Sequence, residues 1–124
     1  MDAALDHDYL VQTTISLIGR ARLDLSNEKR TQAGIAQVLT AAGIAFEPEV
    51  PLSNADIIDF MLGVVGVEVK LKGARKKDVY RQLCRYAEAD AVHSLILATN
   101  LTMGLPKTIN NKPVYFVSLG RAWL

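Results

Sequence analysis

The spacing of hydrophobic and polar positions predicts two helices in the first third of the chain. The first helix is predicted over residues 3–23 from side chains at helical spacing: Leu5, Tyr9, Leu10, Leu17 and Ile18. Ser26 and Asn27 are residue types that cap helices, so a second helix is expected to begin near residue 28 and to stop at Gly43. The inward positions of the second helix are expected to be Ile35, Val38, Leu39 and Ala42.

The remaining two thirds predict strands around one further helix. "FEPEVPL" has two prolines and reads as a connection or a short edge strand. "DIIDFML" (56–62) and "VVGVEVKLK" (64–72) predict a hairpin that turns at Gly63–Val64, followed by a helix from about Lys77 to Ala89. "VHSLILATN" (92–100) predicts a buried strand, and "PVYFVSL" (113–119) predicts the last strand.

Segment 101–112, between these two strands, is expected to be a loop, with turn signals at Gly104, Pro106 and Asn110–Asn111. "GRAWL" (120–124) closes the chain, with Trp123 expected to pack this tail onto the core. The order of elements predicts a mixed α/β fold in a single domain, residues 1–124.

Composition narrows the class of protein only modestly. Half of the residues are hydrophobic, which favours a packed core over disorder, and the net charge of +1 neither requires nor excludes a nucleic-acid partner. The single cysteine, Cys84, excludes an internal disulfide and favours a reducing, cytoplasmic compartment. The N-terminus is acidic, unlike a signal peptide, and no apolar run approaches a membrane span, so no membrane partner is expected.

The predicted hairpin brings three charged residues to one face of the sheet. A turn at Gly63–Val64 places Asp59 opposite Glu68 and Ile57 opposite Lys70, and directly paired residues share a face. Asp59, Glu68 and Lys70 are therefore expected to converge, with Asp56 pointing to the other face. A slip of one residue would reverse this arrangement.

Two paired carboxylates repel each other unless a cation lies between them. Mg²⁺ takes one or two carboxylates, keeps several waters and accepts phosphate oxygens, and Mn²⁺ prefers the same oxygen ligands. Lys70 would then orient or deprotonate a water, or stabilise charge on a phosphate. The plain alternative is a solvated strand face on which Glu68 and Lys70 pair with nearby charges.

The segment "DIIDFMLGVVGVEVK" resembles the core of the PD-(D/E)XK nuclease superfamily. In that superfamily an Asp on one strand and a Glu-x-Lys on the next build a Mg²⁺ site that hydrolyses phosphodiester bonds. Glu28 corresponds to a helical Glu of many members, and Gln82 and Tyr86 match the Q-x-x-x-Y element of RecB-like members. The chain looks similar to small stand-alone members, such as those of phages, including the VRR-NUC and Holliday-resolvase-like groups. The resemblance implies a restriction-endonuclease-like mixed sheet flanked by helices.

The resemblance also implies roles for individual residues. Asp59, Glu68 and the carbonyl of Val69 would bind the metal ion, and Glu28 would contribute through a water or a second ion. Gln82 and Tyr86 would support the site or the substrate. The sequence departs from the pattern because Ala55 and Ile58, not proline, precede the two aspartates. "ADII" resembles the P-D-I-I of archaeal resolvases and nominates Asp56, whereas the hairpin geometry favours Asp59.

Basic residues gather after the second strand of the hairpin. Lys77, Arg81 and Arg85 recur every four residues and predict a basic helical stripe, with further positive charges just before it. Such a stripe is often only a solvated helix face, but here it fits a patch that holds phosphates. The full set is Lys72, Arg75, Lys76, Lys77, Arg81 and Arg85.

These features favour a Mg²⁺- or Mn²⁺-dependent deoxyribonuclease in the cytoplasm of a bacterium or a phage-infected host. DNA is the expected partner, and a homodimer would explain cutting of both strands. A competing interpretation is a non-catalytic nuclease-fold module that binds DNA or protein, for example a phage factor that blocks a host system. A third is a structural subunit of a larger assembly.

Overall fold

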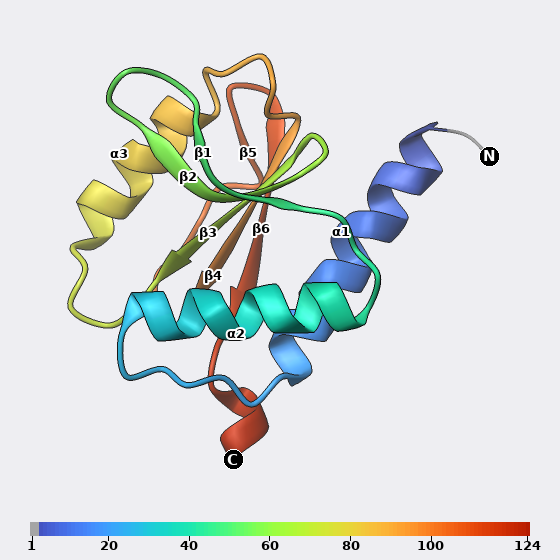
Figure 1. The fold of residues 1–124 in the computed structure, drawn as a ribbon. Coiled ribbons are helices and arrows are strands. Elements are labelled where there is room, and N and C mark those ends of the chain that lie inside the picture. Colours follow the sequence, from blue (N-terminus) through green and yellow to red (C-terminus); the bar gives the residue numbers. More distant parts are fainter. Residues whose placement is uncertain (1–2) are drawn as a thin grey trace.

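A six-stranded mixed β-sheet forms the centre of the molecule, and three α-helices pack on it (Figure 1). The computed structural model describes the backbone of residues 3–124 and the side chains from Asp6 onward. In chain order the elements are α1 (Ala3–Arg20), α2 (Glu28–Ala41), β1 (Glu47–Pro51), β2 (Ile57–Leu62), β3 (Val65–Lys70), α3 (Lys76–Tyr86), β4 (Ser94–Thr99), β5 (Thr108–Ile109), β6 (Lys112–Ser118) and the short 3₁₀-helix η1 (Arg121–Trp123).

The strands stand in the order β1-β2-β3-β4-β6-β5. β1, β2 and β3 form an antiparallel meander, whereas β3, β4 and β6 run parallel. β5 pairs antiparallel with β6 at the far edge. The mixed α/β class predicted from the sequence is confirmed.

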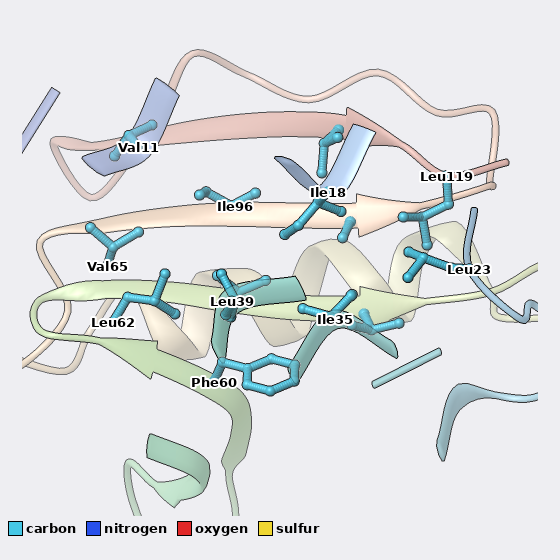
Figure 2. Close-up of a cluster of buried hydrophobic side chains, with 14 residues drawn as sticks. Val11, Ile18, Leu23, Ile35, Leu39, Phe60, Leu62, Val65, Ile96 and Leu119 are labelled. Carbon is cyan, nitrogen blue, oxygen red and sulfur yellow. The ribbon is translucent and has the colours of Figure 1, made fainter. Parts of the chain in front are cut away.

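Two hydrophobic cores lie on opposite faces of the sheet, because successive residues of a strand point to alternate faces. Val67 and Ile96 join α1 and α2 in one core, whereas Leu95 and Leu97 join α3 in the other. Figure 2 shows the first core, whose labelled side chains are Val11, Ile18, Leu23, Ile35, Leu39, Phe60, Leu62, Val65, Ile96 and Leu119. The helices therefore form a layer on each side of the sheet.

α1 ends at Arg20, before the predicted end at residue 23, because the following residues pack as a loop. Leu23 in this loop is 4% exposed and lies so close to α2 that a Cβ on Gly34 would come within 2.9 Å of Leu23 Cδ2. Tyr9, one of the positions at helical spacing from which the helix is predicted, is 73% exposed and does not join its buried face. The predicted contribution of Leu5 falls outside the described side chains. From Asp6 to Arg20, the buried positions of the helix are Val11, Thr14 and Ile18.

α2 begins and ends where its capping residues predict. Asn27 is the N-cap, and its side chain accepts a hydrogen bond from the N–H of Arg30 at 2.9 Å. Gly43 follows the last turn with φ of 73°, a conformation that glycine adopts without strain. Of the four predicted inward positions, two are buried, one is half-buried and one is exposed: Ile35 and Leu39, Val38, and Ala42, respectively.

The hairpin of β2 and β3 has the predicted register. Phe60 pairs with Val67 and Leu62 pairs with Val65, and Gly63 turns the chain with φ of 61°. "FEPEVPL" forms β1, which resolves the open alternative in favour of an edge strand. Its pairing with β2 is interrupted at Glu49, which has φ of 50°.

α3 and the following segments differ from prediction at their ends. The helix stops at Tyr86 rather than Ala89, because a turn closed by a hydrogen bond from Val92 N–H to the Ala89 carbonyl buries Val92. All of β4 is buried, as predicted. Segment 101–112 is not entirely loop, since β5 pairs with β6 across a turn at Asn110–Asn111. The alternation in β5 is too short to be recognised in the sequence.

The C-terminal tail does not pack onto the core as predicted. Trp123 is 57% exposed, its indole Nε1 donates to the carbonyl of Leu23 at 2.9 Å, and the Arg22 guanidinium lies 5.5 Å from its ring centroid. These two contacts hold the tail against the loop between α1 and α2. Because the indole N–H is hydrogen-bonded, the ring can lie at the surface without an unpaired donor.

Candidate functional site

The candidate site forms where β2 and β3 separate. The ladder between them stops at the pair Phe60–Val67, and side chains then replace main-chain partners. The N–H of Asp59 donates to Glu68 Oε1 at 3.2 Å, and the N–H of Val69 donates to Asp59 Oδ2 at 2.8 Å. Each carboxylate thus satisfies a main-chain donor of the other strand, which fixes both where the hairpin opens.

Lys70 and Tyr86 complete the surroundings of Glu68. Lys70 Nζ lies 2.9 Å from Glu68 Oε2, with 18% of the lysine side chain exposed. The hydroxyl of Tyr86 donates to the carbonyl of Ile57 at 2.9 Å and lies 3.2 Å from the same Glu68 oxygen. Tyr86 and Glu68 are both almost fully buried. The structure therefore brings together Asp59, Glu68, Lys70 and Tyr86, from β2, β3 and α3.

Burial and mutual repulsion dominate the electrostatics of the two carboxylates. Burial, followed by the charge of Asp59, raises the pKa of Glu68 to about 7 against the opposing charge of Lys70. Burial also raises the pKa of Asp59, although the hydrogen bond from Val69 opposes this. When both carboxyl groups are ionised, two negative charges face one lysine in a poorly solvated place.

The pKa values of Lys70 and Tyr86 are also raised. Burial by itself lowers the pKa of Lys70, but the charge of Glu68, their hydrogen bond and the charges of Glu28 and Asp59 together raise it. Burial, and then the charge of Glu68, raises the pKa of Tyr86. Lys70 is therefore a cation and Tyr86 a neutral hydroxyl at neutral pH.

The donor set suits a hard divalent cation. Asp59, Glu68 and the carbonyl of Val69 offer oxygen atoms only, and Mg²⁺ typically binds one or two carboxylates and fills its remaining positions with water. A bound cation would also offset the excess negative charge. Across the described residues 3–124, no three side chains among His, Cys, Asp and Glu gather closely enough to hold a metal ion, so Glu28 does not join the pair as a third direct ligand.

Glu28 lies at the first position of α2 and is half-buried. α2 contacts β3, and the charge of Glu28 contributes to the raised pKa of Lys70. It shares a helix face with the buried Ile35 and Leu39, as expected. Glu28 is thus near the site without touching its carboxylates, in keeping with a role through water.

Gln82 is half-buried one helical turn before Tyr86, so both side chains lie on one face of α3. Within residues 3–124, no hydrogen bond joins Gln82 to Asp59, Glu68 or Lys70. Tyr86 therefore enters the site directly, whereas Gln82 lies one turn earlier on the same helix.

Asp56, which the motif "ADII" nominates as a metal ligand, pairs with Arg85. Arg85 Nε lies 3.0 Å and 3.1 Å from the two carboxylate oxygens of Asp56, and Ser53 Oγ approaches the same group at 3.4 Å. The expected orientation toward the opposite face is not observed, because Asp56 precedes β2 and contacts α3, the helix that also carries Tyr86 to Glu68. Asp56 ties the β1–β2 loop to α3, and Asp59 is the aspartate beside Glu68.

The basic residues divide into two groups. Lys72 and Arg75 in the turn after β3, and Lys76, Lys77 and Arg81 on α3, are exposed. Arg85 is also half exposed, but its guanidinium is engaged by Asp56. Arg85 is thereby withdrawn from the free basic patch predicted from the sequence.

Sequence reasoning missed Lys29. Its ammonium lies 2.9 Å from Glu49 Oε1, and its charge also acts to lower the pKa of Asp59, against the larger effect of burial. The sequence did contain a signal for this residue: a lysine in the first turn of a helix interacts unfavourably with the helix dipole, which suggests that a nearby carboxylate compensates its charge.

Comparison of the chain with models of protein families, with curated proteins and with solved structures gives no match. Within residues 3–124, every helix is too short or too polar to span a membrane. The chemistry of the site therefore rests on its own geometry.

Proposed function

We propose that this protein is a metal-dependent nuclease that hydrolyses DNA phosphodiester bonds on a restriction-endonuclease-like fold. The observation that carries the proposal is the convergence of Asp59, Glu68 and Lys70 where β2 and β3 separate. The antiparallel meander of β1 to β3, followed by α3 and the parallel strand β4, supports the fold assignment.

Asp59, Glu68 and the carbonyl of Val69 would hold Mg²⁺ or Mn²⁺, with Glu28 acting through water. Such an ion supplies a polarised water and neutralises charge on the scissile phosphate. The protein positions these ligands by the two hydrogen bonds between carboxylates and main-chain N–H groups. It also limits water around Glu68, which is 2% exposed.

Lys70 is suited to stabilising charge rather than to accepting a proton. Its raised pKa keeps the ammonium protonated at neutral pH in the metal-free chain. Its Nζ has a partly open position beside Glu68, from which it would orient a water or donate to a phosphate oxygen. Tyr86 holds the Glu68 carboxylate and the β2 main chain in place through one hydroxyl.

The test is cleavage of plasmid, single-stranded and four-way-junction DNA with Mg²⁺ or Mn²⁺. Asp59→Asn and Lys70→Ala are expected to abolish cleavage while retaining the wild-type melting temperature within a few degrees. Asp90→Asn, at an exposed position outside the site, is the matched control and should cut normally. Cleavage that survives Asp59→Asn but is lost in a folded Asp56→Asn variant would contradict the assignment of Asp59.

A non-catalytic nuclease-fold module that binds DNA or protein is favoured by one observation. Glu68 Oε2 already has Lys70 and Tyr86 as partners, so a metal ion must share this oxygen or bind the other one. This function predicts unchanged DNA retention on addition or removal of Mg²⁺ and no cleavage of any DNA form. Metal-dependent cleavage would exclude it.

A further inference from the structure

An open groove outside the candidate site runs between α3 and the loop 101–107. Its volume is about 720 Å³, in the range of pockets that hold small organic ligands. One wall is α3 and the other is the loop, and the groove is lined by Lys76, Lys77, Tyr80, Arg81, Thr102, Met103, Gly104 and Pro106. Tyr80 is 41% exposed there.

The groove combines an apolar floor with a positive rim. Tyr80, Met103 and Pro106 supply flat or polarisable apolar surface, and the lining holds lysines and an arginine but no acidic side chain. Asp78 is exposed on the same helix but does not line the groove. This combination suits a ligand with planar apolar groups strung on a negatively charged backbone.

Short backbone connections join both walls of the groove to the strands that carry or flank the candidate site. The turn 71–75 joins Lys70 to the start of α3, and loop 101–107 follows β4 after Thr99, which pairs with Lys70 in the sheet. Lys72 N–H donates to the side chain of Asn100 at 2.8 Å, which ties the two connections together. The two connections that lead to the walls of the groove therefore begin side by side, at the end of β3 that carries Lys70 and at the paired end of β4.

We propose that this groove binds a single-stranded segment of DNA, with one base stacked on Tyr80 and the adjacent phosphates held by Lys77 and Arg81. The identity of the ligand rests on the proposed nuclease function, and the inference adds that the substrate has an unpaired stretch beside the cleaved bond. Bases inside a duplex are covered by their neighbours, so only an unpaired base presents a face to Tyr80. An acidic peptide would use the rim but leave the aromatic floor without a planar partner.

Binding is measured separately from cleavage, by fluorescence anisotropy of a labelled oligonucleotide in EDTA. Tyr80→Ala is expected to weaken binding of single-stranded DNA about tenfold, whereas Tyr80→Phe retains affinity because it keeps the ring. Tyr9→Ala removes an exposed tyrosine from α1, on the opposite side of the sheet, and should bind like wild type. Unchanged affinity in Tyr80→Ala would overturn the proposal, as would equal dependence on Tyr80 for a blunt duplex.

The basic rim gives a second measurement. Lys77→Ala and Arg81→Ala are each expected to weaken binding and to reduce its salt dependence, since each removes about one phosphate contact. Poly-glutamate serves as the competing ligand. If it binds more tightly than the oligonucleotide and its affinity falls in Tyr80→Ala, the proposal is overturned in favour of an acidic protein partner.

Photo-crosslinking of an oligonucleotide that carries 5-iodouracil locates the stacked base directly. A crosslink at Tyr80 supports the groove, and crosslinks confined to other residues overturn it. Binding and crosslinking at Tyr80 without cleavage would leave the groove standing and refute the nuclease. Cleavage by the wild type, together with unchanged affinity in Tyr80→Ala, would refute DNA binding in the groove and leave the proposed nuclease function standing.

Discussion

Replacing Glu68 with glutamine should stabilise the metal-free protein, and the gain should grow with pH. Glu68 is 2% exposed, and burial together with Asp59 raises its pKa from 4.5 to about 7. Between these values the unfolded chain has ionised Glu68 while the folded chain still holds the proton, so stability falls as pH rises. Glutamine cannot ionise and escapes this loss.

The magnitude follows from the pKa difference. A tenfold change in proton affinity is worth about 1.4 kcal/mol, so a fully ionised Glu68 costs the fold about 3 kcal/mol above pH 7. The attraction between ionised Glu68 and Lys70 is already included in this pKa, because Lys70 opposes the increase caused by burial and Asp59, so it adds no separate pH-dependent loss. The advantage of Glu68→Gln over wild type should therefore increase by about 2–3 kcal/mol between pH 5 and pH 8.

Urea unfolding followed by circular dichroism at pH 5 and pH 8 in EDTA measures this increase. Glu88→Gln, at an exposed position just after α3, is the matched control and should show no such growth. An advantage that is the same at both pH values would refute the reasoning, because it would mean that Glu68 is not held in its neutral form by the fold.

Metal ions connect this prediction to the proposed site. If Mg²⁺ binds Glu68, it stabilises wild type at pH 8 by about 1.4 kcal/mol at ten times its dissociation constant, and stabilises Glu68→Gln less. Equal stabilisation of both proteins by Mg²⁺ would show that the ion binds elsewhere.

Three further changes test the packing around the site. Tyr86→Phe removes the hydroxyl that serves the Ile57 carbonyl and Glu68, and urea unfolding should show a loss of about 1–2 kcal/mol; no loss would contradict these buried hydrogen bonds. Gly66→Ala would place a Cβ 2.5 Å from Ile58 Cδ1, so thermal melting should report a loss of about 1–3 kcal/mol, and an unchanged melting temperature would show that Ile58 moves freely. Asn27→Ala removes the N-cap of α2 and should cost about 1 kcal/mol in urea unfolding, with Asn27→Ser as the control that retains a cap.

Features that depend only on neighbouring residues can be predicted from the sequence. Asn27 and Gly43 mark the ends of α2 because capping and left-handed turns are local events. The turn at Gly63–Val64 fixes the register of β2 and β3, and this register placed Asp59 beside Glu68. The convergence of Asp59, Glu68 and Lys70 was therefore predictable without the structure.

Features that depend on partners distant in the chain become visible only in the folded structure. α1 and α3 stop early because Leu23 and Val92 gain burial against elements that local periodicity does not reveal. Arg85 lies in a regular basic stripe, but Asp56, from a loop before β2, engages it. Helix spacing predicts which face a side chain lies on, whereas its partner depends on which loop the fold brings to that face.

The burial of Glu68 likewise came only from the fold. Its carboxylate has a strongly raised pKa because Tyr86, Asp59 and the surrounding sheet remove water from it, and no local pattern in "VEVK" carries that information. The sequence thus determined which groups meet at the site. The tertiary structure decided how strongly those groups perturb one another, because desolvation depends on everything packed around them.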